Sequence, residues 1–372
     1  FHLEGGPGFA ATAALPFYLG PGRGYRRARD LVLLDQRGTG DSNPLHCPAI
    51  ESRSPLEDPY IAADVDACRA ALSRSADLRM FGTAIAADDV DRVRAALGYP
   101  QIDLWALSYG TQLAQVYLRA FPGRVRRAVF MGAAPLDLRT PLWHARNAQR
   151  VLDLLYQQCR AEPACAAAYP TMPELPRGAR AEALRRLLGT TTDQRRLFQL
   201  LDRAARGDGG PLTEAMRGSP SGAAEGLYLS NACAEGTLHI EPGQIEGATA
   251  HTFLGDQRVR SQLAACRRWP VTPVDRSFFA PVRAHAPVLI ISGDMDATTP
   301  PVYADDVCAM LGTCRVIRVP ALAHGPFDLD HWQNGGCVDA LAVAFLEAAD
   351  PRTLDISCVA TMRPPPFALP GR

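Results

Sequence analysis

The 372-residue sequence predicts an α/β fold in which a mostly parallel sheet is flanked by helices and carries an inserted helical cap. Short apolar runs alternate with helical segments up to about residue 137 and again from about residue 281, as in a parallel sheet. Between these stretches the hydrophobic periodicity favours helices. We therefore expect core residues at 1–137, a helical cap at 138–280, and a second core part with a C-terminal tail at 281–372.

Each predicted strand is a short apolar run bounded by glycine, proline or polar residues. Strands are expected at 31–35, 102–105, 127–132, 287–293 and 314–319. The continuous apolar character of residues 31–34 favours a strand that is buried on both faces. The chain itself opens on a short run that leads directly into Glu4 and Gly5, so we expect N-terminal strands to be missing from it.

Helices are expected where apolar residues recur at spacings of three and four. In the core they are predicted at 83–97, 109–121 and 337–349. In the cap they are predicted at 142–159, 180–188, 194–206, 222–233 and 257–268. Thr83 is a suitable N-cap, and Gly98 a suitable residue just beyond a helix C-terminus.

The charge of the chain excludes several classes of partner. The 39 basic and 39 acidic side chains balance, and the sequence has no basic block, which argues against nucleic acid or an anionic membrane as the main partner. No segment reaches the roughly 18 uninterrupted apolar residues of a membrane span. Nothing in the sequence predicts the oligomeric state.

The ten cysteines are the most informative part of the composition. None of them has zinc-ligand spacing, so neither a metal nor another cofactor is expected. The simplest pairing joins neighbours along the chain, as Cys47–Cys68, Cys159–Cys165, Cys233–Cys266, Cys308–Cys314 and Cys337–Cys358. Disulfides would place the protein in a secreted or periplasmic compartment of a bacterium, whereas ten buried thiols are the alternative.

Ser108 lies where an apolar strand gives way to a helix, which is the position of the nucleophile in a nucleophile elbow. Small residues two positions before and after the serine let the strand and the helix pack closely. Here they are Ala106, where glycine is usual, and Gly110. A serine nucleophile needs a base and an acid, which follow it in this order: serine, acid, histidine.

Both partners are available after the cap. Asp294 and Asp296 follow the strand at 287–293, and His324 follows the next strand. We expect Asp296, which lies further into the loop, to be the acid, and Asp294 to serve the turn or a helix cap. The backbone N–H of Tyr109 and the glycine-rich loop at residues 5–8 are candidate donors to an oxyanion.

These motifs together resemble the proline iminopeptidase and tripeptidyl aminopeptidase family. The segments that carry the resemblance are Gly-Gly-Pro-Gly at 5–8, Asp-Gln-Arg-Gly-Thr-Gly-Asp-Ser at 35–42, Ser-Tyr-Gly at 108–110, Gly293 to Pro300, and His324-Gly325. The cysteine order, including Cys266-x-x-Trp269, resembles the secreted tripeptidyl branch. The resemblance implies an α/β-hydrolase fold with a helical cap, and Ser108, Asp296 and His324 as its catalytic triad. Gly6 and Tyr109 would donate to the oxyanion.

The sequence departs from the family in two places, Ala106 and Glu4, where many relatives have histidine before the glycines. Glu4 is therefore a candidate substrate-binding residue. We also expect Asp35 and Arg37 to form an ion pair that shapes the oxyanion loop.

The predicted function is a serine hydrolase that releases N-terminal residues or short peptides through an acyl-enzyme. An aminopeptidase must compensate the charge of the substrate ammonium, and we expect Glu235 to do so, with Glu225 as the second choice. A secreted esterase or amidase with the same triad is the alternative, and a catalytically silent binding protein is a third reading. The expected ligand is a peptide or a small amide or ester.

Overall fold

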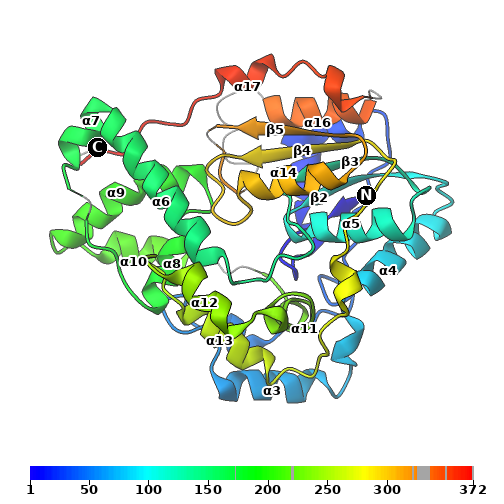
Figure 1. Cartoon of the computed structure of the whole chain (residues 1–372), viewed down its shortest axis with the longest axis horizontal. Coiled ribbons are helices and arrows are strands. Elements are labelled where there is room, and N and C mark those ends of the chain that lie inside the picture. The colour runs from blue at the N-terminus through cyan, green and yellow to red at the C-terminus, as the bar shows by residue number, and fades with distance from the viewer. Residues whose placement is uncertain (172, 219–221, 321, 325–335, 348–349, 371–372) are drawn as a thin grey trace.

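The computed structural model describes the chain except for residues 172, 219–221, 321, 325–335, 348–349 and 371–372. Its centre is a five-stranded sheet in which every neighbouring pair runs parallel. The strands, in spatial order, are β1 (His2–Leu3), β2 (Ile102–Leu107), β3 (Val125–Met131), β4 (Val288–Gly293) and β5 (Cys314–Val319). The predicted α/β class with a parallel sheet flanked by helices is confirmed (Figure 1).

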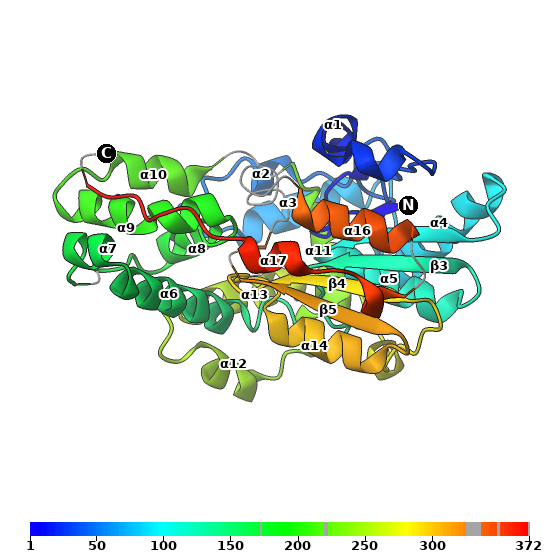
Figure 2. The same ribbon diagram turned by 90° about the horizontal axis from the view of Figure 1, so that it is seen from above.

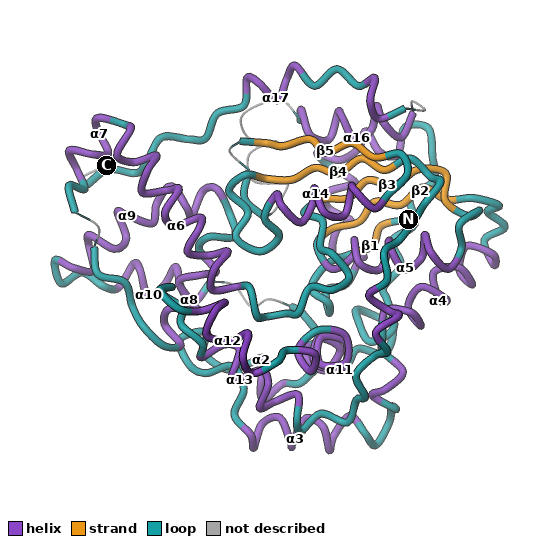
Figure 3. The backbone as a smooth tube through the Cα atoms, viewed as in Figure 1, coloured by secondary structure: helices purple, strands orange, loops and turns teal. Residues whose placement is uncertain are grey.

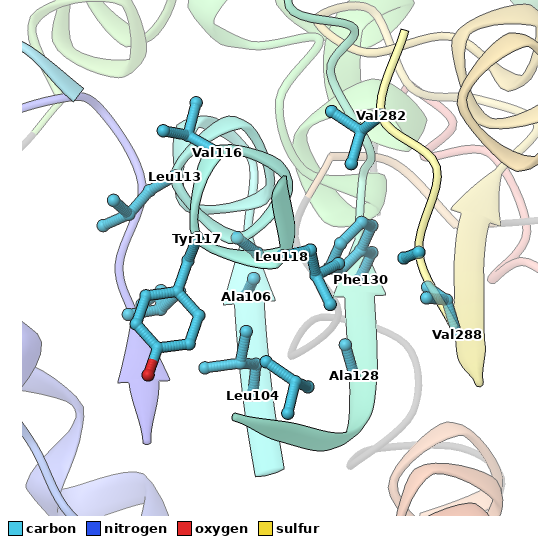
Figure 4. Packing of buried hydrophobic residues seen from close by; sticks show 14 of the residues in the cluster. Leu104, Ala106, Leu113, Val116, Tyr117, Leu118, Ala128, Phe130, Val282 and Val288 are labelled. Atoms are coloured by element: carbon cyan, nitrogen blue, oxygen red, sulfur yellow. The ribbon is translucent and has the colours of Figure 1, made fainter. Parts of the chain in front are cut away.

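The sheet is covered by helices on both faces (Figure 2). The helices on one face are α4 (Thr83–Ala96), α5 (Tyr109–Ala120) and α14 (Pro301–Met310); those on the other are α1 (Leu15–Leu19), α16 (Cys337–Glu347) and α17 (Ser357–Thr361). Side chains alternate between the two faces because successive strand residues point in opposite directions. Leu104 and Ala106 pack under α5 together with Phe130 (Figure 4), whereas Trp105 packs on the opposite face.

The strand predicted at 31–35 is reduced to a single bridge, between Leu33 and His2. Residues 31–34 lie at the edge of the sheet beside the two-residue strand β1 and are only half-buried. Full burial on both faces was therefore a wrong expectation for this run. The chain turns away directly afterwards, where Asp35 accepts hydrogen bonds from the backbone N–H groups of Thr12 and Asp41.

The cap contains helices and, among its described residues, no strand (Figure 3). Its helices are α6 (His144–Ala161), α7 (Pro163–Ala168), α8 (Ala179–Arg186), α9 (Thr191–Ala205), α10 (Gly210–Arg217), α11 (Glu225–Glu235), α12 (Pro242–Thr249) and α13 (Gln257–Cys266). All five predicted cap helices are present. The helices α7, α10 and α12, of six to eight residues, were not predicted.

Two segments outside the predicted cap pack against it. The segment with α2 (Pro48–Glu51) and α3 (Ala62–Leu72) shares a buried cluster with residues of α11 and α13. The C-terminal tail lies along α9, where Phe367 packs on Phe198 and the N–H of Ala368 donates to the carbonyl of Arg195 (Figure 2). The cap side of the molecule is thus built from three separate stretches of sequence.

The ten cysteines form five disulfides, which are the neighbour pairs predicted from the sequence. Cys159–Cys165 and Cys233–Cys266 lie in the cap, and Cys47–Cys68 lies in the segment that packs on it. Five disulfides are typical of proteins that fold in an extracellular or periplasmic compartment. Within the described residues, no helix is long and apolar enough to span a membrane.

The remaining connections include six 3₁₀ turns in the described chain. They are Ala11–Ala14, Pro21–Arg26, Leu78–Met80, Thr237–His239, Arg276–Phe279 and Pro351–Thr353.

Candidate active site

Ser108 occupies a strained turn between β2 and α5. Its φ of 53° and ψ of −120° lie in a region that a residue with a side chain rarely adopts. Glycine is required two residues later, at Gly110, since a Cβ there would come within 2.0 Å of the carbonyl oxygen of Leu3. Ala106 is fully buried between the strand and α5, so the extra methyl group is accommodated in the core. The turn holds the Ser108 hydroxyl at the carboxyl edge of the sheet.

Ser108, His324 and Asp296 form a continuous hydrogen-bonded chain. The Ser108 Oγ lies 3.1 Å from His324 Nε2, and His324 Nδ1 lies 2.9 Å from Asp296 Oδ2. The three side chains follow β2, β5 and β4, so three parallel strands deliver them to the same edge of the sheet. This geometry fits a nucleophile, a base and an acid.

The surroundings of Asp296 keep it ionised. Its Oδ1 accepts hydrogen bonds from the backbone N–H groups of Thr298 and Thr299, at 2.7 and 2.8 Å, and its Oδ2 accepts one from the Thr299 hydroxyl. Burial alone would raise the pKa of Asp296, but the His324 imidazole and these donors lower it overall. Burial likewise disfavours the charged form of His324, yet the Asp296 carboxylate leaves the pKa of His324 raised.

Asp294 takes no part in this chain of hydrogen bonds. Its backbone N–H donates to the carbonyl of Val319, and its own carbonyl accepts from Arg150. The structure therefore brings Asp296, and not Asp294, to His324.

The glycine-rich loop passes directly against the nucleophile. A Cβ built on Gly5 would lie 3.2 Å from the Ser108 Cβ, and Gly6 has a φ of 111°, which favours glycine. Gly6 and Tyr109 both line the cavity in front of Ser108. This placement is compatible with the predicted pair of oxyanion donors.

Glu4 lines the same cavity, but both of its oxygens already have partners. Oε1 accepts from the backbone N–H of Gly5, and Oε2 lies 2.8 Å from His2 Nε2. Burial works to raise the pKa of Glu4, but the His2 hydrogen bond and the Gly5 N–H lower it overall. Glu4 is thus better suited to holding the loop in place than to contacting substrate.

The predicted ion pair between Asp35 and Arg37 is wrong. The Arg37 guanidinium instead pairs with Asp89 on α4, at 2.5 and 2.7 Å, while Asp35 accepts hydrogen bonds from Thr12 and Asp41. Asp35 and Arg37 are close in sequence, but their side chains have different partners.

The cavity in front of Ser108, which we call the catalytic cavity, has a volume of about 340 Å³. Glu235 lies in its wall. Its carboxylate accepts hydrogen bonds from the N–H and the hydroxyl of Thr83, at 2.6 and 2.5 Å. Thr83 begins α4 but does not cap it, since Gly82 occupies the N-cap position. The Thr83 hydroxyl and the Asn231 amide both contact the Tyr109 phenol, at 3.0 and 3.1 Å. Glu235 is therefore connected through side chains to the residue that follows the nucleophile.

Burial raises the pKa of Glu235 to about 7, although the hydrogen bonds from Thr83 act in the opposite direction. Such a carboxylate changes its charge near neutral pH. A cation that entered the cavity would lower this pKa and hold the side chain ionised.

Glu225, the second candidate for recognising an amine, does not line the catalytic cavity. It lies in a neighbouring cavity, where its carboxylate accepts a hydrogen bond from the Tyr60 hydroxyl. Glu225 and Glu235 lie at opposite ends of α11, and of the two only Glu235 lines the cavity in front of Ser108.

The cap also supports the loop that carries the acid, a feature that the sequence did not indicate. Arg150 on α6 donates to the carbonyls of Asp294 and Asp296, at 3.0 and 2.7 Å. Gln194 on α9 donates to the carbonyl of Met295. Arginine on an amphipathic helix is usually a surface residue, so only the packing of α6 on the loop reveals this contact.

His144 is another cavity residue that sequence reasoning missed. It begins α6, lines the catalytic cavity and is held neutral, because burial lowers its pKa to about 3. Asn231, Arg185 and Arg258 also line the cavity without any local motif to mark them. In the described parts of the chain, no group of three or more metal-ligating side chains is present.

The comparisons with known proteins agree with this geometry. Residues 7–158 match the alpha/beta hydrolase fold family, and residues 251–358 match a family described as TAP-like protein. The chain is 32% identical to the tripeptidyl aminopeptidase of Streptomyces lividans over 134 residues, 32% of this chain and 25% of the relative. It is 32% identical to a protein described as a proline iminopeptidase of Streptomyces coelicolor, over 36% of this chain and 32% of the relative.

The Escherichia coli protein YuaR, described as a hydrolase, is 28% identical over 44% of this chain and 34% of its own length. The matched segments therefore span only a quarter to a third of these relatives.

The fold and the matches over both core parts define the chain as an α/β-hydrolase. Its relatives in sequence include proteins described as a tripeptidyl aminopeptidase and a proline iminopeptidase.

Proposed function

We propose that this hydrolase is a serine exopeptidase, which releases N-terminal residues or short peptides through an acyl-enzyme. The observation that carries the proposal is the presence of a buried carboxylate, Glu235, in the same cavity as the Ser108–His324–Asp296 chain. The names of the relatives support the same class of substrate.

The proposed reaction begins with attack of the Ser108 Oγ on the scissile carbonyl carbon, while His324 Nε2 takes the hydroxyl proton. Asp296 stabilises the imidazolium that forms. The backbone N–H groups of Gly6 and Tyr109 would donate to the negatively charged oxygen of the tetrahedral intermediate. His324 then gives its proton to the leaving amine, and water hydrolyses the acyl-enzyme by the same steps.

Glu235 would bind the ammonium group of the substrate. A charged amine that leaves water for a partly enclosed cavity needs a compensating charge, and a carboxylate provides it. Both Glu235 oxygens accept hydrogen bonds from Thr83, which hold the carboxylate in place without neutralising its charge. Each carboxylate oxygen can accept a further hydrogen bond, so an ammonium can be added to this arrangement.

The five disulfides support a secreted or periplasmic site of action. Peptides with free N-termini would meet the enzyme there.

The decisive experiment compares free and N-acetylated forms of prolyl, alanyl and tripeptidyl amides, together with a butyrate ester, on the wild-type enzyme and on Glu235→Gln. We expect Glu235→Gln to raise KM for free amines by about tenfold or more, about 1.4 kcal/mol, and to leave the acetylated and ester substrates nearly unchanged.

Two controls accompany this test. Glu241→Gln changes an exposed cap glutamate and should alter neither class of substrate. Ser108→Ala should reduce kcat for every substrate by several orders of magnitude and abolish labelling by a fluorophosphonate. Equal losses on both classes in Glu235→Gln would argue for an esterase or amidase with a structural glutamate. Absence of turnover on all substrates, with no labelling, would argue for a binding protein.

A further inference from the structure

A second cavity, of about 540 Å³, adjoins the catalytic cavity on the side of the cap. The two cavities share Arg185 of α8 and Arg258 of α13, which line both of them. These two guanidinium groups therefore form the wall between the space in front of Ser108 and the second space.

The two arginines differ in how their charges are compensated. Arg185 pairs with Glu182, and both its Nε and Nη2 contact Oε1, at 2.9 and 2.7 Å. Arg258 forms no ion pair with any described residue. Its Nη2 lies 3.3 Å from the Tyr228 hydroxyl, its guanidinium lies over the Tyr60 ring at 5.1 Å, and its Nε is buried without a hydrogen-bond partner.

The nearby carboxylates make their hydrogen bonds to other residues. Glu182 pairs with Arg185 through Oε1, while its Oε2 is buried without a hydrogen-bond partner, and Glu225 accepts its hydrogen bond from Tyr60. Their fields favour the charged form of Arg258, but neither comes within ion-pair distance of it. A guanidinium stays charged at any physiological pH, and its fork of N–H groups matches a carboxylate. Arg258 thus places a permanent positive charge in the cavity wall, and no carboxylate of the described residues pairs with it.

The distance between Arg258 and Glu235 indicates which part of a peptide substrate Arg258 could contact. Its hydrogen-bond partner Tyr228 and the proposed amine anchor Glu235 lie on the same helix, α11, about two turns apart. Two turns correspond to about 10 Å, the length of about three extended residues. A single glutamyl residue cannot span that distance between its ammonium and its own side-chain carboxylate, whereas a short peptide with an acidic side chain on a later residue can.

We propose that Arg258, assisted by Arg185, forms an anion subsite that recognises an acidic side chain within the peptide to be released. The subsite would favour aspartyl or glutamyl residues after the first residue of the substrate. This inference rests on the proposed function, in that the cavity must hold the acyl part of a peptide. It adds to that function a preference for a negatively charged side chain in the released peptide and a minimum length of that peptide.

The test is a matched set of tripeptidyl p-nitroanilides in which glutamate or glutamine is placed at each position of an alanine tripeptide. Each is prepared with a free and with an acetylated N-terminus. The ratio of kcat/KM between the glutamate and glutamine forms reports on Arg258, and the ratio between the free and acetylated forms reports on Glu235. The two ratios are independent, so failure of the exopeptidase proposal and failure of the anion subsite are told apart.

In the wild-type enzyme we expect glutamate to be preferred to glutamine by about tenfold at the second or third position. Arg258→Met, which keeps the apolar length of the side chain, should bring this ratio close to one and change the glutamine substrates by less than about threefold. Arg258→Lys should restore part of the preference. Arg217→Met removes an exposed arginine at the rim of the second cavity and is the matched control, for which the ratio should not change.

A wild-type ratio below about two at all three positions would overturn the proposal, as would an unchanged ratio in Arg258→Met. Inhibition of the wild-type enzyme provides a second measurement that does not depend on the folding of a variant. N-acetyl-alanyl-glutamate amide should inhibit more strongly than the glutamine analogue, and 0.5 M salt should reduce the difference, since it screens partly exposed charges. Equal inhibition by the two compounds would also overturn the proposal.

Discussion

The sheet core and the cap position their functional residues by different physical means. In the core, Ser108, Asp296 and His324 follow the parallel strands β2, β4 and β5, and the register of the sheet fixes where each strand ends. In the cap, Glu235, Arg185 and Arg258 project from three helices that no ladder aligns. The disulfide Cys233–Cys266 and a shared buried cluster hold α11 and α13, and α8 packs in a second buried cluster of the cap. Backbone hydrogen bonds of the sheet therefore position the candidate catalytic residues, whereas side-chain packing positions the charged residues of the cap.

The cap also forms hydrogen bonds with the loops that carry Asp296 and His324. Arg150 and Gln194 reach from cap helices to carbonyls of the acid loop, and the backbone N–H of His324 donates to the carbonyl of Gly189. Displacement of the cap would therefore disturb the acid and the base together. Three experiments test this difference between the two regions.

The largest effect is expected from removal of a cap disulfide. Cys233 and Cys266 close a loop of 33 residues, so the double substitution to serine should lower the free energy of unfolding by about 4 kcal/mol. It should also raise KM, because α11 and α13 carry Glu235 and Arg258. The measurements are denaturation by urea and steady-state kinetics of the folded fraction.

The matched control is the core disulfide Cys308–Cys314, which closes a loop of six residues. Its removal should cost about 2 kcal/mol and leave KM unchanged, since α14 lies outside the catalytic cavity. If both double variants change KM alike, the cap is not held in place by its own cross-link.

Arg150→Met should reduce kcat by about 10- to 50-fold with little change in KM. Hydrogen bonds from a charged donor contribute about 1.5–3 kcal/mol each, and the two carbonyls that accept them belong to the loop of Asp296. Arg146→Met, on the same helix, removes an arginine that stacks on Trp143 and should leave kcat unchanged. A rise in KM with constant kcat in Arg150→Met would mean that the contact shapes the cavity and does not position the acid.

The smallest effect, about tenfold, concerns pH. His324 acts as a base in its neutral form, and its pKa is raised, so kcat/KM for acetylated substrates should rise with pH through a value above 6.5 and then level off. For free amines Glu235 must also ionise, near pH 7, while the substrate ammonium is lost above about pH 8. Free-amine substrates should therefore show an optimum between these values.

In Glu235→Gln, the free-amine profile should lose its falling limb and approach the acetylated one. Coincident profiles for both substrate classes in the wild-type enzyme would contradict an ionic anchor for the amine.

The sequence alone was sufficient for the class of fold and for the placement of Ser108, Asp296 and His324 at one edge of the sheet. These follow from local signals: apolar runs define the strands, and the special turns after them require particular residues, such as Gly110 against the carbonyl of Leu3. The neighbour pairing of the cysteines was also accessible, since each pair closes a short or moderate loop.

Features that depend on long-range packing were missed or wrongly assigned. Arg37 pairs with Asp89, 52 residues away, and not with its neighbour Asp35. The segment around Cys47 and Cys68 and the tail at Phe367 pack on the cap, although the sequence places them next to core elements. Glu225 and Glu235 look equivalent on one helix, yet they face different cavities.

The difference between the features that were predicted and those that were missed has a physical reason. A strand–turn–helix motif is specified by steric and hydrogen-bonding constraints within a few residues, and parallel pairing then brings successive strand ends together. The inward direction of a cap residue such as Arg258 depends on how α8, α11 and α13 pack, which involves contacts across more than 70 residues of sequence. Local sequence signals were thus enough for the fold class and the candidate chemistry, whereas the packing of the cap helices sets which charged side chains face the substrate.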